Sequence, residues 1–326
     1  MVTLITNHLQ FTARTLTPLE LEAQSGAAIR GALMNSLWER FCTNKAAPTC
    51  TDCPLVRVCP VATLVAPMRD EGEKGSDQRP RPYVIEPPSS TARRYEPGET
   101  LTFGLGIFGT ATDLFPYLVI AAQELETQGL GRKLAALGYQ RGQLRVEELA
   151  AVSPLTGERQ ILYQRGQPQV HMPGLPITAT EVQAYAASLP TDRLTLVLHT
   201  PLRLVDDQRL VRRPALRPLV QRLLRRLGDL SIAYGNGDLE LDFAALLAQA
   251  AQARVVDDQT RWLDVVSHSS RQQRRTPIGG LVGQVTFAGD LATLRELLVW
   301  GMLVHVGRNV VKGDGWYTVT GASAAL

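Results

Sequence analysis

The order of strand-like and helix-like segments is the feature of this sequence that most constrains its fold. Residues 3–13 alternate in polarity as a half-buried strand does. Ser25 can cap the helix that follows, whose apolar stripe consists of Ile29, Leu33 and Leu37. The expected elements of this half are a strand at 3–13, a helix from 25 to about 41, strands at 82–86 and 100–108, a helix at 114–128 and a strand at 134–146.

The second half of the chain repeats this order, although no residue-level repeat is visible. Its expected elements are a strand at 194–204, helices at 215–227 and 243–251, strands at 261–266 and 278–287, a helix at 291–303 and a closing strand at 316–319. This order is that of the ferredoxin-like split motif. We therefore predict an α+β fold of two tandem ferredoxin-like domains. They would span 1–150 and 191–326, with a cysteine-rich insertion at 42–81 after the first helix and a linker at 151–190.

Composition sets few limits on function. A chain of 326 residues can bury two cores, and 44% hydrophobic residues is ordinary for a globular protein. We find no apolar run of membrane-spanning length and no signal peptide at Met1, so we expect a cytoplasmic protein without a membrane partner. The net charge is only +3, but nearly all the positive charge is arginine, which binds phosphates and stacks on bases. Genomic composition or heat adaptation would explain the same bias.

All four cysteines lie in one short segment with the spacing C-x7-C-x2-C-x5-C: Cys42, Cys50, Cys53 and Cys59. The C-x2-C pair can bring two thiolates to one metal through a tight turn. Four thiolates would form a closed structural zinc site, and an iron–sulfur cluster could use the same ligands. Disulfides are disfavoured in the cytosol. The segment therefore predicts a structural metal site that holds the loop after the first helix, with no catalytic metal.

The C-terminal segment 279–317 combines a glycine-started apolar strand, a short helix and a glycine-rich loop. The loop contains Gly307, Gly313 and Gly315 together with the cations Arg308 and Lys312. Glycines allow a backbone to approach a ligand closely, and clustered amides with cations suit a phosphate. The loop lacks the Gly-Lys-Ser/Thr ending of a nucleotide-binding P-loop. The pattern therefore favours a phosphate chain over a nucleoside triphosphate.

These segments resemble the C-terminal signature of the Cas6 family, the CRISPR-associated RNA-processing endoribonucleases of the RAMP superfamily. The resemblance extends through the chain, over Ser25-Gly26, Arg30-Gly31-Ala32-Leu33, the segment 103–109, Thr200-Pro201-Leu202-Arg203-Leu204, the segment 223–227 and the segment 270–275. Each motif is weak alone, but they occur together and in the family's order. The resemblance implies tandem ferredoxin-like domains of the RRM or RAMP type. It also implies CRISPR repeat RNA as the partner, read as a hairpin with a single-stranded flank, and association with other CRISPR effector subunits.

The family's chemistry is cleavage of RNA without a catalytic metal. The 2′-hydroxyl attacks the neighbouring phosphate, which leaves 2′,3′-cyclic phosphate and 5′-hydroxyl ends. Histidine suits the proton transfers, and arginine suits the charge that develops on the phosphate. The candidates are His305 in the C-terminal motif, His8 on the first strand and Arg30 on the first helix. Alternatively, His305 packs beneath the loop and His8 is a surface residue of its strand.

One departure from the family pattern favours a second reading. Many relatives carry a catalytic histidine where this chain has Asn35, and an asparagine cannot shuttle a proton. The alternative function is therefore a catalytically weak or inactive RNA-binding subunit of a CRISPR effector complex. A metal-binding scaffold without an RNA role is a third possibility.

Three groups of residues are expected to contact RNA. The resemblance places the first group, Arg271, Arg274 and Arg275, near the repeat RNA. The second group has helical spacing opposite an apolar stripe and could equally be a solvated face: Arg222, Arg225 and Arg226. The third group is the C-terminal loop: Gly307, Arg308, Lys312, Gly313 and Gly315.

Overall fold

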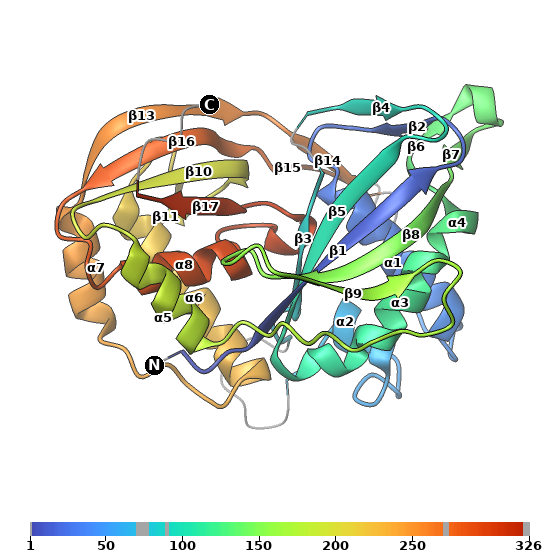
Figure 1. The fold of residues 1–326 in the computed structure, drawn as a ribbon, viewed down its shortest axis with the longest axis horizontal. Coiled ribbons are helices and arrows are strands. Elements are labelled where there is room, and N and C mark those ends of the chain that lie inside the picture. Colours follow the sequence, from blue (N-terminus) through green and yellow to red (C-terminus); the bar gives the residue numbers. More distant parts are fainter. Residues whose placement is uncertain (1, 70–77, 89–90, 270–273, 322–326) are drawn as a thin grey trace. The chain divides into compact units, whose positions relative to one another are not determined.

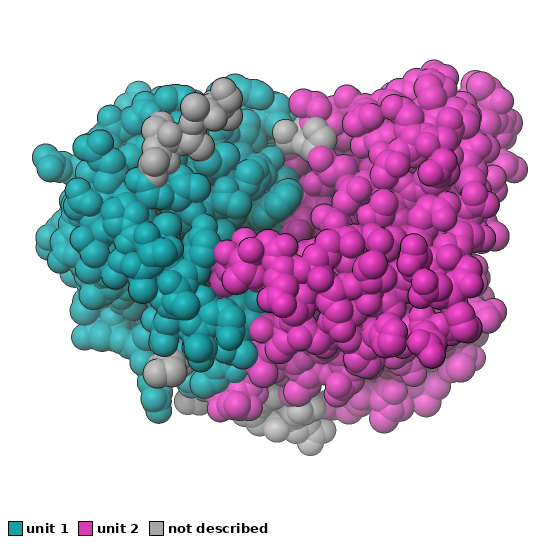
Figure 2. All heavy atoms as spheres, in the orientation of Figure 1, with its two compact units in different colours: residues 1–3, 177–228, 238–326 teal, residues 4–176, 229–237 magenta. Residues whose placement is uncertain are grey.

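The structure is a computed structural model that describes residues 2–69, 78–88, 91–269 and 274–321. The chain forms two compact units (Figure 2). Unit 1 contains Met1–Thr3, Ile177–Gly228 and Asp238–Leu326, and unit 2 contains Leu4–Pro176 and Asp229–Gly237. Each unit has the strand and helix order of a ferredoxin-like domain, so the predicted tandem fold is confirmed.

Unit 2 is built on a five-stranded antiparallel sheet with the order β3-β5-β1-β8-β9 (Figure 1). The strands are β1 (Thr6–Thr15), β3 (Tyr83–Glu86), β5 (Thr100–Phe108), β8 (Leu144–Val152) and β9 (Arg159–Gln164). The helices α1 (Gly26–Phe41) and α3 (Phe115–Gln123) pack against each other and against strands of this sheet. With β9 left aside, the strands have the neighbour relations of a ferredoxin-like sheet.

Shorter elements complete unit 2. They are α2 (Pro60–Val65), the 3-10 turns Gly109–Leu114 and Ala135–Leu137, α4 (Leu125–Gln128), and the paired strands β2 (Leu19–Leu21) with β4 (Arg93–Tyr95) and β6 (Leu130–Leu134) with β7 (Gln140–Gly142). The strand expected at 134–146 begins later, at Leu144. Gly138 and Tyr139 have positive φ angles of 62°, so the chain turns there and cannot continue as a strand.

Alternation along β1 separates the two faces of the unit 2 sheet. Leu9, Phe11 and Ala13 are fully buried, and the rings of Phe11 and Phe103 stack with their centroids 4.9 Å apart. The intervening residues include His8, which lies opposite Gly106 of β5. Because successive side chains of a strand point to opposite faces, His8 lies on the face away from this aromatic core.

Unit 1 is built on a four-stranded antiparallel sheet with the order β13-β16-β10-β17. The strands are β10 (Arg193–Leu202), β13 (Arg254–Leu263), β16 (Gly280–Ala288) and β17 (Tyr317–Thr320), and the helices are α5 (Ala179–Ser188), α6 (Leu216–Tyr234), α7 (Phe243–Gln252) and α8 (Arg295–Val304). Shorter elements are β11 (Val205–Asp206) with β12 (Arg209–Leu210), β14 (Val266–Ser269) with β15 (Arg274–Pro277), and a 3-10 turn at Val310–Lys312.

The segment 151–190, expected to be a linker, is largely structured. It contains the end of β8, all of β9 and all of α5. The start of α5 is fixed by a capping box. Thr178 Oγ1 accepts a hydrogen bond from the amide of Thr180 (3.2 Å), and Glu181 Oε2 accepts one from the amide of Thr178 (2.8 Å). The division between the two units follows Pro176, because β9 pairs with β8 in unit 2 and α5 packs on α8 in unit 1.

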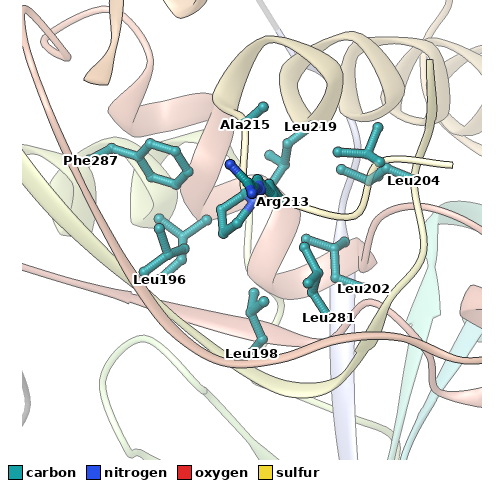
Figure 3. Close-up of a pocket in the computed structure, with 12 residues that line it drawn as sticks. Leu196, Leu198, Leu202, Leu204, Arg213, Ala215, Leu219, Leu281 and Phe287 are labelled. Atoms are coloured by element: carbon teal, nitrogen blue, oxygen red, sulfur yellow. The ribbon is translucent and has the colours of Figure 1, made fainter. Parts of the chain in front are cut away.

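An apolar pocket lies between the sheet of unit 1 and the start of α6 (Figure 3). Leu196 and Leu198 of β10, Phe287 of β16 and Leu219 of α6 line it. Among the lining residues Arg213 carries a charge, and the others are apolar. Such a lining belongs to core packing and does not suit a polyanion. Within the described residues, no helix is both long and apolar enough to cross a membrane.

Candidate nucleic-acid interface

The C-terminal glycine loop packs into unit 1. Gly307, Gly313 and Gly315 have positive φ angles of 100°, 90° and 72°. The amide of Gly313 donates to Val310 O (3.0 Å), and the amide of Gly315 donates to Pro201 O (3.0 Å). Both glycines are buried, so in this arrangement these two amides are occupied by backbone carbonyls, and the RNA contact predicted for the glycines stays a prediction. The glycines instead let the loop turn against the end of β10.

The two cations of this loop differ in exposure. Arg308 is exposed, and its amide donates to Arg203 O (3.0 Å), which fixes the loop to the end of β10. Lys312 is half-buried. Arg308 is therefore the loop residue best placed to meet a phosphate from solvent.

His305 lies at the end of α8 and has no exposed surface. Its ring lies parallel to that of Trp316, with the centroids 6.1 Å apart. A general acid or base must come within hydrogen-bond reach of the reacting atoms. The burial of His305 supports the alternative of a histidine packed beneath the loop, and its role as acid or base stays a prediction.

His8 is also buried, with 1% of its surface exposed. Its Nδ1 lies 2.9 Å from Oε1 of Glu86, so the neighbouring strand holds the ring. The alternative of His8 as a surface residue of its strand is therefore wrong, and its role as acid or base stays a prediction. Of the other three histidines, His199 is half-buried with Nε2 3.0 Å from Thr318 Oγ1, His171 is exposed, and His268 lies on β14.

Arg30 is half-buried on α1, and its Nε donates to the phenol oxygen of Tyr83 (3.0 Å). A second guanidinium, that of Arg81, lies close enough to interact electrostatically with Arg30. Arg81 precedes β3, and its Nε donates to Val65 O (2.7 Å). Burial lowers the pKa of Arg81, and the positive charge of Arg30 lowers it further. In the described ranges neither arginine forms an ion pair with an acid. We call these two residues the Arg30–Arg81 pair, and such a pair is suited to an anion such as a phosphate.

The basic face predicted on α6 is divided. Arg222 donates from Nε to Val205 O (2.9 Å), and Arg226 donates from Nε to Val304 O (2.7 Å). These two side chains hold neighbouring backbone segments, which the spacing alone did not indicate. Arg225 is exposed and remains a candidate for RNA contact.

The arginine group expected near the repeat RNA falls mostly on a hairpin of unit 1. Arg274 and Arg275 lie on β15, opposite Ser269 and His268 of β14. Arg271 lies outside the described residues.

A cation–aromatic cluster in unit 1 was not predicted. The guanidinium carbon of Arg212 lies 4.5 Å from the centroid of the Trp262 ring, and that of Arg203 lies 5.9 Å from it. Nη1 of Arg203 also donates to Gly279 O (2.7 Å), at the start of the glycine strand. The sequence contained a partial signal, since Arg203 belongs to the Thr-Pro-Leu-Arg motif. Nothing in the local pattern connects it to Trp262.

Asp314, between Gly313 and Gly315, is 1% exposed. Burial raises its pKa to about 8, although Asn309, Lys312 and Arg203 each favour the charged form. The carboxyl group is therefore mostly neutral at pH 7. It does not cancel the positive charge of the neighbouring arginine.

Replacing Asp314 by asparagine should flatten the pH dependence of stability. The unfolded chain loses this proton near pH 3.8 and the folded state near pH 8, so the folded protein loses stability as the pH rises through that window. The free energy of unfolding should fall by at most about 1.4 kcal/mol per pH unit in this window. Urea denaturation at several pH values should show the decline in the wild type and a smaller one in Asp314→Asn. Equal slopes in both proteins would contradict the assignment.

The four cysteines form no disulfide in the described part of the chain, and all are half-buried. Asn44 Nδ2 lies 3.5 Å from the sulfur of Cys53. In the part of the chain that the structure describes, no three His, Cys, Asp or Glu side chains gather closely enough to hold a metal ion. The predicted structural metal site therefore stays a prediction.

Metal content tests the cysteine prediction directly. If the thiolates bind structural zinc, purified protein should contain about one zinc per chain, and Cys50→Ser with Cys53→Ser should lose it. Visible absorption of the purified protein would indicate an iron–sulfur cluster instead. Metal-free protein that melts at the same temperature after zinc is added would refute a structural site.

Comparison with known proteins identifies the family. Residues 196–317 match the model of the CRISPR-associated endoribonuclease Cas6. Residues 4–175, more than half of the chain, match the AF_1859_N model, described as an N-terminal domain. A search of curated proteins finds no match.

Solved structures share the fold at low sequence identity. A Cas6 product complex from Thermus thermophilus is 16% identical over 97% of this chain and 99% of that chain, with a TM-score of 0.56. A chain of a partial Cas6-RT-Cas1–Cas2 complex is 14% identical over 100% of this chain and 48% of that chain, with a TM-score of 0.61. Identities this low show the fold alone. The family models go further and assign residues 196–317 to the Cas6 family of CRISPR-associated endoribonucleases.

Proposed function

We propose that this protein binds CRISPR repeat RNA and cleaves it without a catalytic metal. The observation that carries the proposal is the match of residues 196–317 to the Cas6 family. The product would then be handed to, or kept in, an interference complex. Arg30, Arg81 and Arg212 form no ion pair with an acid among the described residues, and this supports a polyanionic ligand, because a phosphate chain supplies negative charge.

The proposed reaction is attack of a 2′-hydroxyl on the adjacent phosphate. The 2′-oxygen bonds to phosphorus as its proton passes to a water molecule, and the bond from phosphorus to the 5′-oxygen breaks as that oxygen takes a proton from water. The products are a 2′,3′-cyclic phosphate and a 5′-hydroxyl. We propose that the Arg30–Arg81 pair stabilises the negative charge that develops on the phosphate, with Arg30 in the role that the family resemblance implies.

The rate should be modest because no histidine is assigned to the proton transfers. General acid–base catalysis contributes about 10²- to 10⁴-fold, and His305 and His8 are too buried to supply it directly. Positioning of the RNA and charge stabilisation would then carry the reaction.

A second candidate is a subunit that binds repeat RNA without cutting it. Asn35 favours this function, because it is exposed on α1 and cannot transfer a proton. The two functions share the RNA-binding surface and differ only in chemistry. Other CRISPR effector subunits are proposed partners in either case.

Incubation of repeat RNA with the protein in EDTA distinguishes the candidates. Products with 2′,3′-cyclic phosphate ends support cleavage, and replacement of the nucleotide at the cut by its 2′-deoxy analogue should then abolish it. Tight binding with intact RNA supports the binding subunit. Failure to bind repeat RNA at low salt would reject both functions.

A further inference from the structure

The geometry points to the cluster of Trp262, Arg212 and Arg203 as a stacking subsite for an unpaired nucleotide of single-stranded RNA. We call these three residues the Trp262 cluster. The inference rests on the proposed RNA binding and adds the part of the RNA that this cluster takes.

The tryptophan ring is fixed in place. Trp262 lies near the end of β13, paired with Leu281 of β16, and is half-buried. Its indole nitrogen donates to Oδ1 of Asp264 (2.9 Å). The polar edge of the ring is therefore already bonded, so a base would meet the ring at a face, in place of the guanidinium group that lies over it.

The two arginines are held differently. Arg203 is half-buried and anchored by its bond to Gly279 O, while its own carbonyl receives the amide of Arg308. Arg212 is exposed, and its contact with the ring is a cation–π contact at 4.5 Å. Arg212 can therefore move from the ring onto a phosphate at small cost, since exposed cation–π contacts contribute only about 0.5–1 kcal/mol.

The charge at this cluster favours a nucleic acid. Within the described residues, neither Arg203 nor Arg212 forms an ion pair. Asp264, the acid beside the ring, accepts a hydrogen bond from the indole N–H of Trp262. The buried Asp314 near Arg203 is mostly neutral at pH 7. Two positive guanidinium groups beside an aromatic face match the phosphate and base of one nucleotide.

An unpaired nucleotide fits better than a paired one. Bases in a duplex are already stacked and cannot offer a free face, whereas a single-stranded flank can. Stacking of a base on an aromatic side chain contributes about 1–3 kcal/mol and tolerates any base. The cluster should therefore strengthen binding of the flank with little preference for its sequence.

The test compares repeat RNA with its single-stranded flanks against the hairpin alone. Trp262→Ala should weaken binding of the flanked RNA by about 10-fold and leave hairpin binding unchanged. Trp262→Phe should retain most of the affinity, because it keeps an aromatic face. Arg212→Gln should reduce the slope of log affinity against log salt concentration by about one, for the flanked RNA only.

The matched control is Trp38→Ala. Trp38 is another partly exposed tryptophan with a cation over its ring, because Lys45 Nζ lies 5.0 Å from its centroid. This variant should bind both RNAs as the wild type does.

The outcomes separate the subsite from the proposed function. An equal loss for both RNAs, or unchanged binding of the flanked RNA by folded Trp262→Ala, would overturn the subsite. Should Trp262→Ala not fold, an Arg212→Gln variant with the wild-type affinity and the wild-type salt dependence for the flanked RNA would overturn it. A wild type that binds neither RNA would reject the proposed function itself.

Discussion

Replacing Arg30 by methionine should slow cleavage of repeat RNA by about 100-fold. Methionine keeps the aliphatic bulk of the side chain and removes the positive charge. The remaining guanidinium, Arg81, is desolvated and already bonded to Val65 O, so it cannot replace the lost charge. Tyr83 also loses a hydrogen-bond donor, which should lower stability by about 1 kcal/mol. Single-turnover rates at saturating protein concentration measure the effect on chemistry alone.

Two further variants make this experiment specific. Arg40→Met removes an exposed arginine from the same helix, one whose contact with Glu124 is a long 3.9 Å pair, and should cut at the wild-type rate. Arg30→Lys keeps the charge without the Nε bond to Tyr83 and should give an intermediate rate. A wild-type rate in Arg30→Met would remove the Arg30–Arg81 pair from the mechanism.

The same variants remain informative for a protein that binds without cutting. In that case Arg30→Met should weaken repeat-RNA binding at low salt and reduce the dependence of affinity on salt by about one counterion. Arg40→Met should change neither quantity. An effect of the same size in both variants would indicate only the loss of one positive charge from α1, with no specific phosphate contact.

The fold was predictable because periodicity records burial. Leu9 and Phe11 alternate with polar residues along β1, and Leu223 and Leu227 recur at the spacing of a buried helix face. Periodicity failed where a turn interrupted an apparent strand, as at Gly138. The capping box at Thr178 shows a start signal for α5 that an assignment of 151–190 as linker overlooked.

The candidate site was less predictable, because sequence does not show which side of a loop faces the core. A glycine-rich loop with cations suggests a phosphate site, yet the amides of Gly313 and Gly315 bond to backbone carbonyls. His305 lies in the family's motif, but its side chain is buried. Arg212 and Trp262 are fifty positions apart, so only the paired strands and loops of the folded unit bring them together. Contacts of this kind leave no local pattern.

Replacing Gly315 by alanine should cause the largest loss of stability predicted for this protein. Gly315 has a φ of 72°, which costs a residue with a side chain about 1–2 kcal/mol. A Cβ at this position would also overlap the carbonyl oxygen of Val306. Relieving the overlap must disturb the bond from Val306 N to Gly315 O (3.1 Å), or that from Gly315 N to Pro201 O. Together we expect a loss of about 4 kcal/mol or more, measured by urea denaturation with tryptophan fluorescence.

Gly289→Ala is the control that separates strain from overlap. Gly289 lies in the same unit and has a φ of 148°, but the nearest atom to a Cβ there is Ala253 Cα at an ordinary 3.5 Å. The loss of stability in Gly289→Ala should reflect backbone strain alone, about 1–3 kcal/mol. Unit 1 contains Trp262, Trp300 and Trp316, so the fluorescence change reports mainly on this unit. Equal losses in the two variants would mean that the loop can yield at Val306. The turn would then not hold Arg308 and Arg203 rigidly. The amide of Arg308 bonds to Arg203 O, and that of Gly315 bonds to Pro201 O two residues earlier.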